Sequence, residues 1–371
     1  MTESILAELV SIPSVSALSN APIIRYAESL LAPCGWHLRR FEWADTAGVE
    51  KINLVVSSHA RPDAELAFVG HTDTVPADPE WPDAFQLIPR EDCLHGLGTT
   101  DMKGFLASCL ALFARLNPRS LAHPLMLVLT ADEEVGCLGA KRLAAESAIA
   151  PRRAIVGEPT QLSPVRAGKG YGLGRVVVRG CEAHSAFPEQ GRSAIIDAAH
   201  LLARLEALAG EFSEERHEDY MPPYPTLNVG TISGGRAKNI IPGECEFLVE
   251  FRPVGGAAPE RLRDRIAAAL AQMRAVRPGL EFSFSAARLD PGFETPADSE
   301  LVATVASLTG GEPATVSFGT EAPQMAALGA EVVVCGPGDM LRAHRRNEFI
   351  LRSELTACDT FLRELVQRYC A

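Results

Sequence analysis

Short apolar runs alternate with longer amphipathic stretches over much of this chain, and this alternation constrains the fold more than any other feature. Three runs in the first half have the length and composition of interior strands: Ala-Glu-Leu-Ala-Phe-Val-Gly (64–70), Leu-Met-Leu-Val-Leu (125–129) and Arg-Ala-Ile-Val (153–156). Residues 102–116 are mostly apolar and predict a largely buried helix. Buried strands separated by helices indicate the α/β class, a mostly parallel sheet flanked by helices.

The middle of the chain has a different order of elements. The pattern there predicts, in order, strand 173–179, helix 191–208, strands 226–232 and 244–252, helix 258–276 and strand 280–285. This β-α-β-β-α-β order is typical of a ferredoxin-like α+β domain. The α/β pattern then resumes with helix 298–308, strand 331–335 and helix 352–369. We therefore expect a first domain made of 1–171 and 289–371, with a second domain, 172–288, inserted into it.

Composition and charge exclude several functions. The chain has 371 residues, a hydrophobic content of 47% and a net charge of −12, which argues against nucleic-acid and anionic-membrane partners. No apolar run is long enough to cross a bilayer, and the N-terminus lacks the basic region of a signal peptide. The nine cysteines form no CxxC pair. We expect a cytoplasmic protein with reduced thiols.

Two adjacent acids, Glu133 and Glu134, follow the apolar strand at 125–129. Neighbouring carboxylates at a strand end repel each other and are costly to desolvate. A nearby cation would relieve that cost. The simplest hypothesis is that one of the two glutamates binds a metal ion and the other moves a proton.

Other metal-binding residue types stand at similar places. His71 follows strand 64–70, Glu158 follows strand 153–156, and His344 comes after strand 331–335. Because the carboxyl ends of parallel strands share one edge of a sheet, these side chains are expected to gather there. Asp101 stands where helix 102–116 begins. Asp73, two residues after His71, is placed to hold the second ring nitrogen of that histidine.

Five candidate ligands result: His71, Asp101, Glu134, Glu158 and His344. They are too many for one tetrahedral zinc ion but suit two metal ions that share a bridging carboxylate. Glu133 is then left to carry a proton. Taken singly, each has a simpler explanation, such as a helix N-cap for Asp101. Their joint occurrence beside Gly or Pro at strand ends favours the metal site.

Four segments together resemble one known family, the co-catalytic zinc amidohydrolases and peptidases. They are Gly-His-Thr-Asp-Thr-Val-Pro (70–76), Gly-Thr-Thr-Asp-Met-Lys-Gly (98–104), Ala-Asp-Glu-Glu-Val-Gly (131–136) and Gly-Glu-Pro-Thr (157–160). The resemblance covers essentially the whole chain and implies a dizinc exopeptidase-like fold, with the inserted domain as a lid and dimerisation domain. One departure is Arg-Arg-Asn-Glu (345–348), which replaces a more usual Pro-Asp-Glu ending.

The resemblance also implies roles for the ligands. Asp101 would bridge two metal ions, with His71 and Glu158 completing one site and Glu134 and His344 the other. Asp73 would orient His71. The peptide bond after the bridging aspartate is cis in this family, so Asp101–Met102 is expected to be cis.

Four further residues and a histidine are candidates for the substrate. Arg252 and Asn239 match positions that hold the substrate carboxylate in relatives, while Gly319 and Thr320 offer a backbone N–H and a hydroxyl. His184 would stabilise the tetrahedral oxyanion, and in the resembled family this histidine comes from the partner subunit. The simpler explanations are a surface-loop histidine and a strand-end surface arginine.

The expected reaction is hydrolysis of the amide bond of an N-acyl amino acid, with N-acetylornithine as the first candidate substrate. Glu133 would act as general base and then as general acid on a metal-bridged water. Zn²⁺ is the expected ion, with Co²⁺ or Mn²⁺ as alternatives. Other substrates remain open, namely N-succinyl-diaminopimelate, N-acetylcitrulline or a dipeptide. A non-catalytic ligand-binding homologue is disfavoured because no ligand and no proton carrier is missing. We expect a homodimer.

Overall fold

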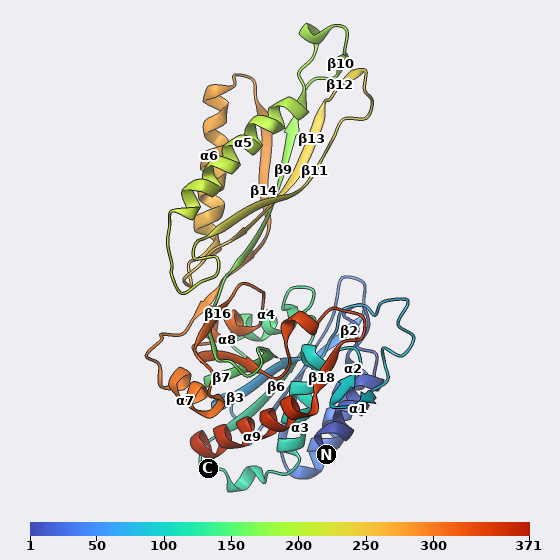
Figure 1. Ribbon diagram of the computed structural model, residues 1–371, viewed down its shortest axis with the longest axis vertical. Coiled ribbons are helices and arrows are strands. Elements are labelled where there is room, and N and C mark those ends of the chain that lie inside the picture. The colour runs from blue at the N-terminus through green and yellow to red at the C-terminus, as the bar shows by residue number, and fades with distance from the viewer. The chain divides into compact units, whose positions relative to one another are not determined.

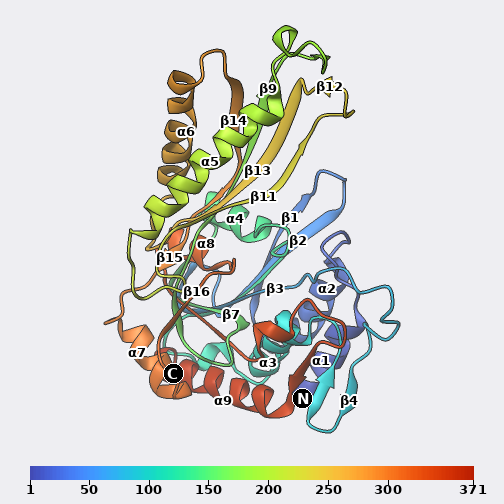
Figure 2. The same ribbon diagram turned by 45° about the horizontal axis from the view of Figure 1, so that its top comes forward.

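The computed structural model describes residues 1–371, which form two compact units (Figure 1, Figure 2). Unit 1 consists of residues 1–166, 295–314 and 320–371, and unit 2 of residues 167–294 and 315–319. The chain therefore enters unit 2 twice. The short return at 315–319 was assigned to the first domain in the sequence-based division.

A mixed sheet whose central strands are parallel lies in the middle of unit 1. In spatial order its strands are β1 (His37–Ala44), β2 (Glu50–Ser57), β6 (Leu125–Thr130), β3 (Asp63–His71), β7 (Ala150–Pro159), β17 (Glu331–Gly336) and β8 (Val165–Gly168), with the short strands β15 (Phe293–Glu294) and β16 (Ala314–Val316) paired to β8. Strand β3 is parallel to β6 and β7, and β17 is parallel to β7. The predicted α/β class is confirmed, and the antiparallel β1–β2 hairpin at the edge is an addition to it.

Helices cover this sheet (Figure 1) and bury their apolar faces against it. One core joins the sheet to α1 (Thr2–Ser11), α2 (Ala21–Leu31), α3 (Gly104–Phe113), α7 (Glu300–Thr309) and α9 (Arg352–Tyr369). Helix α3 is buried over almost its whole length, as its nearly uniform apolar sequence requires. Helices α4 (Leu138–Ala145) and α8 (Ala322–Ala327) contact each other, and α8 also contacts β7 and β17. A small separate sheet contains β4 (Ile88–Arg90), β5 (Cys93–His95) and β18 (Phe349–Leu351).

Two glycines allow neighbouring elements to approach the end of β7 closely. A Cβ atom at Gly157 would lie 2.1 Å from the ring of Phe105 in α3, and one at Gly336 would lie 2.1 Å from the carbonyl oxygen of Gly157. The register between β7 and β17 also shifts between Val334 and Gly336. Since no larger residue fits without moving the backbone, these glycines keep α3 and β17 tight against the segment that carries Glu158.

Unit 2 has the predicted α+β fold. Its elements in chain order are β9 (Tyr171–Arg179), α5 (Ala194–Ser213), β11 (Thr226–Gly234), β13 (Glu244–Arg252), α6 (Pro259–Val276) and β14 (Glu281–Asp290). The strands form an antiparallel sheet in the order β11-β13-β9-β14, and α5 and α6 pack on it around a single apolar core. A two-residue pairing joins β10 (Ala183–His184) to β12 (Ile240–Ile241). None of the helices in the structure is both long enough and apolar enough to cross a membrane.

Candidate metal centre

The carboxyl ends of four adjacent parallel strands bring the acidic and histidine side chains of unit 1 together. His71 is the last residue of β3, Glu134 comes shortly after β6, and Glu158 lies near the end of β7. His344 lies in the loop that follows β17. Strands β6, β3, β7 and β17 are neighbours in the sheet, so the four residues come from one edge.

Asp101 lies between the two histidines. Its Oδ1 is 3.1 Å from Nε2 of His71, and its Oδ2 is 3.2 Å from Nε2 of His344. The same His344 nitrogen is 3.1 Å from Glu134. Ligand atoms of His71, Asp101 and Glu134 all lie within 4.8 Å of one another. Each oxygen of Asp101 therefore faces a different imidazole, as expected of a carboxylate that bridges two ions.

Glu158 is the third acidic residue of the group. It is 2% exposed, and its Oε1 is buried without a hydrogen-bond partner. A buried carboxylate oxygen left unpaired is costly, so a ligand is expected to satisfy it. The charges of Asp101 and Glu133 act on Glu158, which places it beside the same cluster.

Local backbone structure directs the Asp101 carboxylate into the cluster. Asp101 precedes α3 and has φ −121° and ψ 93°, so it interrupts the helical turn that runs from Thr99 to Lys103. The Asp101–Met102 peptide bond is cis, as the family resemblance implied.

Asp73 holds two parts of the site at once, and the structure revises how it does so. The ring nitrogen Nδ1 of His71 lies 3.0 Å from the main-chain carbonyl of Asp73, whereas its distance to Oδ1 of that residue is 3.6 Å. Because a carbonyl only accepts, Nδ1 carries a hydrogen there, and Nε2 is the ring nitrogen that faces Asp101 and could bind an ion once it loses its own hydrogen. The Asp73 carboxylate instead accepts the backbone N–H groups of Glu133 and Glu134, at 3.1 and 3.3 Å. It therefore orients the turn that carries both glutamates.

Glu133 is held by a thiol that the sequence did not single out. Cys137, at the start of α4, places its Sγ 3.4 Å from Oε1 of Glu133 and 3.5 Å from the main-chain oxygen of Thr320. Burial strongly raises the pKa of this thiol, so it stays protonated and acts as a donor.

The cluster has a strongly negative potential. Burial lowers the pKa of His71, but the hydrogen bond and charge of Asp101 outweigh it and hold that pKa well above the usual 6.5. Hydrogen bonds to Asp101 and Glu134 raise the pKa of His344 to about 10. Burial, followed by the charges of Glu134 and Asp101, raises the pKa of Glu133 to about 8, although His71 acts in the opposite direction. The field that favours protonated imidazoles also attracts a metal cation.

These residues fit divalent metal ions. Two imidazoles and three carboxylates are donors that zinc, cobalt and manganese all accept. A cation would pair the orphan oxygen of Glu158 and would offset the repulsion between Asp101, Glu134 and Glu158.

The substrate residues expected from the sequence lie mainly in unit 2. His184 and Asn239 are neighbours there, because His184 pairs with Ile240 and the main-chain oxygen of Asn239 accepts from Ser185. The Nδ1 atom of His184 accepts the N–H of Ala186 at 3.1 Å, so its neutral ring carries hydrogen on Nε2, where it can donate.

Arg252 is the last residue of β13, at the end of the strand that lies away from Asn239. Its guanidinium donates to Glu250 and to the main-chain oxygen of Ser317 and lies over the ring of Tyr171. Gly319 is the last residue of the segment 315–319, which also contains Ser317. Thr320 is buried in unit 1, where its hydroxyl accepts from the N–H of Ala322.

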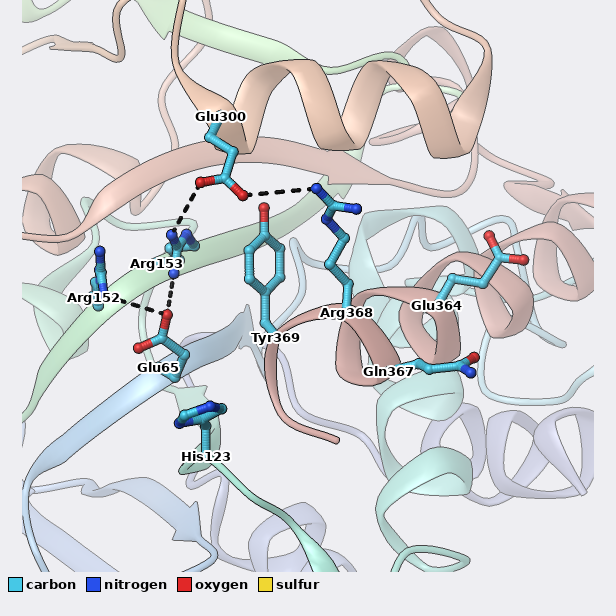
Figure 3. A pocket seen from close by; sticks show the side chains of 9 residues that line it. All are labelled: Glu65, His123, Arg152, Arg153, Glu300, Glu364, Gln367, Arg368 and Tyr369. Atoms are coloured by element: carbon cyan, nitrogen blue, oxygen red, sulfur yellow. Dashed lines mark hydrogen bonds and ion pairs between the residues drawn. The ribbon is translucent and has the colours of Figure 1, made fainter.

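One pocket of unit 1 lies away from this cluster (Figure 3). A cavity of about 630 Å³ lies at the amino ends of β3 and β7, whereas the cluster lies at the carboxyl ends of the strands. Its arginines are already paired: Arg153 contacts Glu65 and Glu300, and Arg368 contacts Glu300. The guanidinium of Arg153 also lies 4.5 Å from the centre of the Tyr369 ring. This pocket is best explained as an ion-pair network that joins α7, α9 and the strand starts.

Comparisons with known proteins agree with the fold and show the family. The family model described as peptidase family M20/M25/M40 matches residues 67–368. An acetylornithine deacetylase of Myxococcus xanthus is 47% identical over 370 residues, which cover 98% of this chain and 96% of that protein. The crystal structure of aminopeptidase PepT from Bacillus cereus superposes with a TM-score of 0.80 at 20% identity and covers 99% of this chain and 98% of that one. A Bacillus subtilis protein described as a dinuclear metal binding peptidase from the M20 family superposes with a TM-score of 0.70 at 12% identity and covers 98% and 96%.

The fold and the donor cluster define a metal-binding hydrolase. The chain belongs to peptidase family M20/M25/M40.

Proposed function

We propose that this protein hydrolyses the amide bond of N-acetylornithine to give ornithine and acetate, a step of arginine biosynthesis. The observation that carries the proposal is the edge cluster of His71, Asp101 and Glu134, with Glu133 beside it. The substrate is taken from the 47% identical relative, which matches this chain over 98% of its length and is named for this reaction. We place the protein in the cytoplasm.

Two divalent ions, most simply Zn²⁺, would be held by the five expected ligands. Asp101 would be shared by the two ions, His71 and Glu158 would hold one of them, and Glu134 and His344 would hold the other. When bound, such ions supply Lewis acidity, which polarises the amide carbonyl and makes water a better nucleophile near neutral pH. Co²⁺ and Mn²⁺ suit the same donors.

Glu133 moves the proton. An amide is a poor electrophile, so attack by water needs a base, and the departing amine needs an acid. The raised pKa of Glu133, about 8, suits a carboxyl group that takes a proton from water and later gives it to the leaving nitrogen. The Cys137 thiol bonds only Oε1, which keeps the carboxyl oriented while Oε2 exchanges the proton.

The expected substrate residues of unit 2 form two separate groups, His184 with Asn239 and Arg252 with Gly319. Their separation supports an active site that is shared between two subunits. Strand β13 runs from Glu244, next to the β12 turn, to Arg252. At ~3.3 Å per residue, the two ends of β13 are roughly 26 Å apart. Asn239 lies near the start of this strand and Arg252 at its end, too far from each other to hold one carboxylate. We therefore propose a homodimer in which His184 and Asn239 reach the site of the partner, while Arg252, Gly319 and Thr320 serve their own. His184 then donates from Nε2 to the oxyanion, and unit 2 acts as lid and dimerisation domain.

A panel of substrates tests the proposed reaction. We expect kcat/KM for N-acetylornithine to exceed that for N-acetylcitrulline, N-succinyl-diaminopimelate and a dipeptide by at least ~10-fold, a difference of about 1.4 kcal/mol.

The variant Glu133→Gln tests the proton-transfer role. It should keep its metal content and lose about 10²–10⁴-fold in kcat, the range for general acid–base catalysis. Glu146→Gln, an exposed carboxyl at the end of α4, is the control and should behave as wild type. A higher kcat/KM for another compound of the panel would show that N-acetylornithine is not the preferred substrate. Wild-type turnover by Glu133→Gln would show that Glu133 does not transfer the proton.

Arg252→Ala tests recognition of the substrate carboxylate. A hydrogen bond to a charged group contributes about 1.5–3 kcal/mol, so KM should rise roughly 10- to 100-fold for N-acetylornithine. The increase should vanish for the analogue amidated at that carboxylate. Arg288→Ala removes the other arginine that lies over the Tyr171 ring and should leave both KM values within about twofold. Equal increases for acid and amide substrates would refute the carboxylate role.

Mixing two inactive variants tests the shared site. His184→Ala and Glu133→Gln each inactivate a homodimer, but a mixed dimer contains one site with both residues intact. We expect unfolding and refolding of an equimolar mixture to recover about a quarter of wild-type activity, because half of the dimers are mixed and one of two sites works in each. Absence of recovery in a preparation shown to contain mixed dimers would mean that His184 acts within its own chain.

A further inference from the structure

Glu348 is a buried carboxylate that no ligand or proton-transfer role explains. It is 2% exposed and lies four residues beyond His344. Its side chain accepts three backbone N–H groups, all from the segment that leads into Asp101. Oε2 accepts from Gly98 at 3.0 Å, and Oε1 accepts from Thr100 at 2.8 Å and from Asp101 at 3.0 Å.

The surrounding backbone strengthens this connection between the two segments. The N–H of Gly96 donates to the main-chain oxygen of Glu348 at 3.0 Å, and the Thr100 hydroxyl donates to the carbonyl of Phe349 at 2.6 Å. Strand β18, which begins at Phe349, pairs with β5 immediately before Gly96. The segment that carries His344 and the segment that carries Asp101 are thus joined along several consecutive residues.

These contacts determine where two expected metal ligands meet. Asp101 and His344 approach to 3.2 Å, although they lie far apart in the sequence. Asp101 has a non-helical backbone conformation within a helical turn, and its own N–H bonds to Glu348. The direction of its carboxylate therefore depends on that bond.

We propose that Glu348 is a positioning residue that holds Asp101 and His344 in register and thereby sets the affinity of the metal centre. The inference rests on the proposed function only in taking the cluster to bind metal. Glu348 itself contacts no ion and takes no part in the proton transfer.

A carboxylate suits this position for a specific chemical reason. Three donors converge on the side chain from two sides, and only a carboxylate presents acceptors on both oxygens. Glutamine has almost the same shape, but its NH₂ group would face backbone N–H groups on one side. Lys103 is fully buried and donates to the carbonyl of Ile12. Burial lowers the pKa of Lys103 to about 7, while the nearby charge of Glu348 acts to raise it.

Glu348→Gln is therefore the test variant, and Asp359→Asn is its control. Asp359 is a partly buried carboxylate on α9 that accepts the Thr2 hydroxyl at 2.7 Å and ties α1 to α9. Both variants replace one carboxylate oxygen by an NH₂ group, but only Glu348 connects the ligand-carrying segments. The readout is Zn²⁺ affinity, measured on metal-free protein by competition with a chromophoric chelator, together with the ion count per chain and the Tm without metal.

We expect Glu348→Gln to bind at least one Zn²⁺ about 10- to 100-fold more weakly than wild type, the usual effect of removing a partner that orients a ligand. Asp359→Asn should lower Tm but keep the affinity within about twofold. Affinity in Glu348→Gln within twofold of wild type would overturn the inference while leaving the proposed function intact. Failure of the wild-type protein to bind Zn²⁺ would overturn both.

A milder variant keeps the test decisive if Glu348→Gln does not fold. Thr100→Val removes only the hydroxyl bond to Phe349 and preserves the shape of the side chain. It should weaken Zn²⁺ binding about 3- to 10-fold. Unchanged affinity in this variant would also overturn the inference.

Discussion

Repulsion among acidic side chains at one edge of a buried sheet is the constraint on which the rest of this structure depends. Asp101, Glu134 and Glu158 converge there with Glu133, and all four are largely removed from water. Mutual repulsion and desolvation act together, as the raised pKa values of Glu133 and Glu158 indicate. Such a group is stable only if positive charge is added. The two histidines supply part of that charge, and the proposed metal ions supply the rest.

The fold keeps this unfavourable group in place through hydrogen bonds to the backbone of the turns that carry the acids. The acceptors of these bonds are carboxylates from elsewhere in the sequence. The Asp73 carboxylate holds the turn of Glu133 and Glu134, and Glu348 holds the turn of Asp101. Glycines at 157 and 336 keep the end of β7 fixed beside them. Four of the five proposed ligands lie at or beyond strand ends, whereas Asp101 precedes α3. The residues that hold them come from neighbouring loops. This division explains how the cluster can be oriented before any ion binds.

Much of this arrangement was predictable, because its main signals are local in the sequence. His71, Glu134 and Glu158 each follow an apolar run, so their common edge follows from strand order alone. Helix α9 was expected at 352–369 and is found there because a regular apolar spacing fills the whole segment. The β-α-β-β-α-β order of unit 2 was equally readable from alternating strand and helix patterns.

The supporting contacts were not predictable, since they join residues distant in the sequence. The bond between Glu348 and the N–H of Asp101 spans 247 positions, and a glutamate in the pattern Arg-Arg-Asn-Glu gives no local sign of it. Asp73 was expected to hold His71 with its carboxylate. Instead, the main-chain carbonyl of Asp73 accepts from His71, and its carboxylate accepts the N–H of Glu133. The thiol of Cys137 resembles any small core residue until its distance to Glu133 is known.

Thermal unfolding of the metal-free chain at increasing Zn²⁺ concentration tests the central claim most directly. If the acidic cluster is stabilised mainly by bound cations, the free energy of unfolding should rise with ion concentration, by about 4 kcal/mol per site at 1,000 times Kd. Tm should keep rising above saturation, with the dependence expected for two ions per chain. A Tm that does not respond to Zn²⁺, Co²⁺ or Mn²⁺ would contradict the account, because the acids would then be stable without a metal.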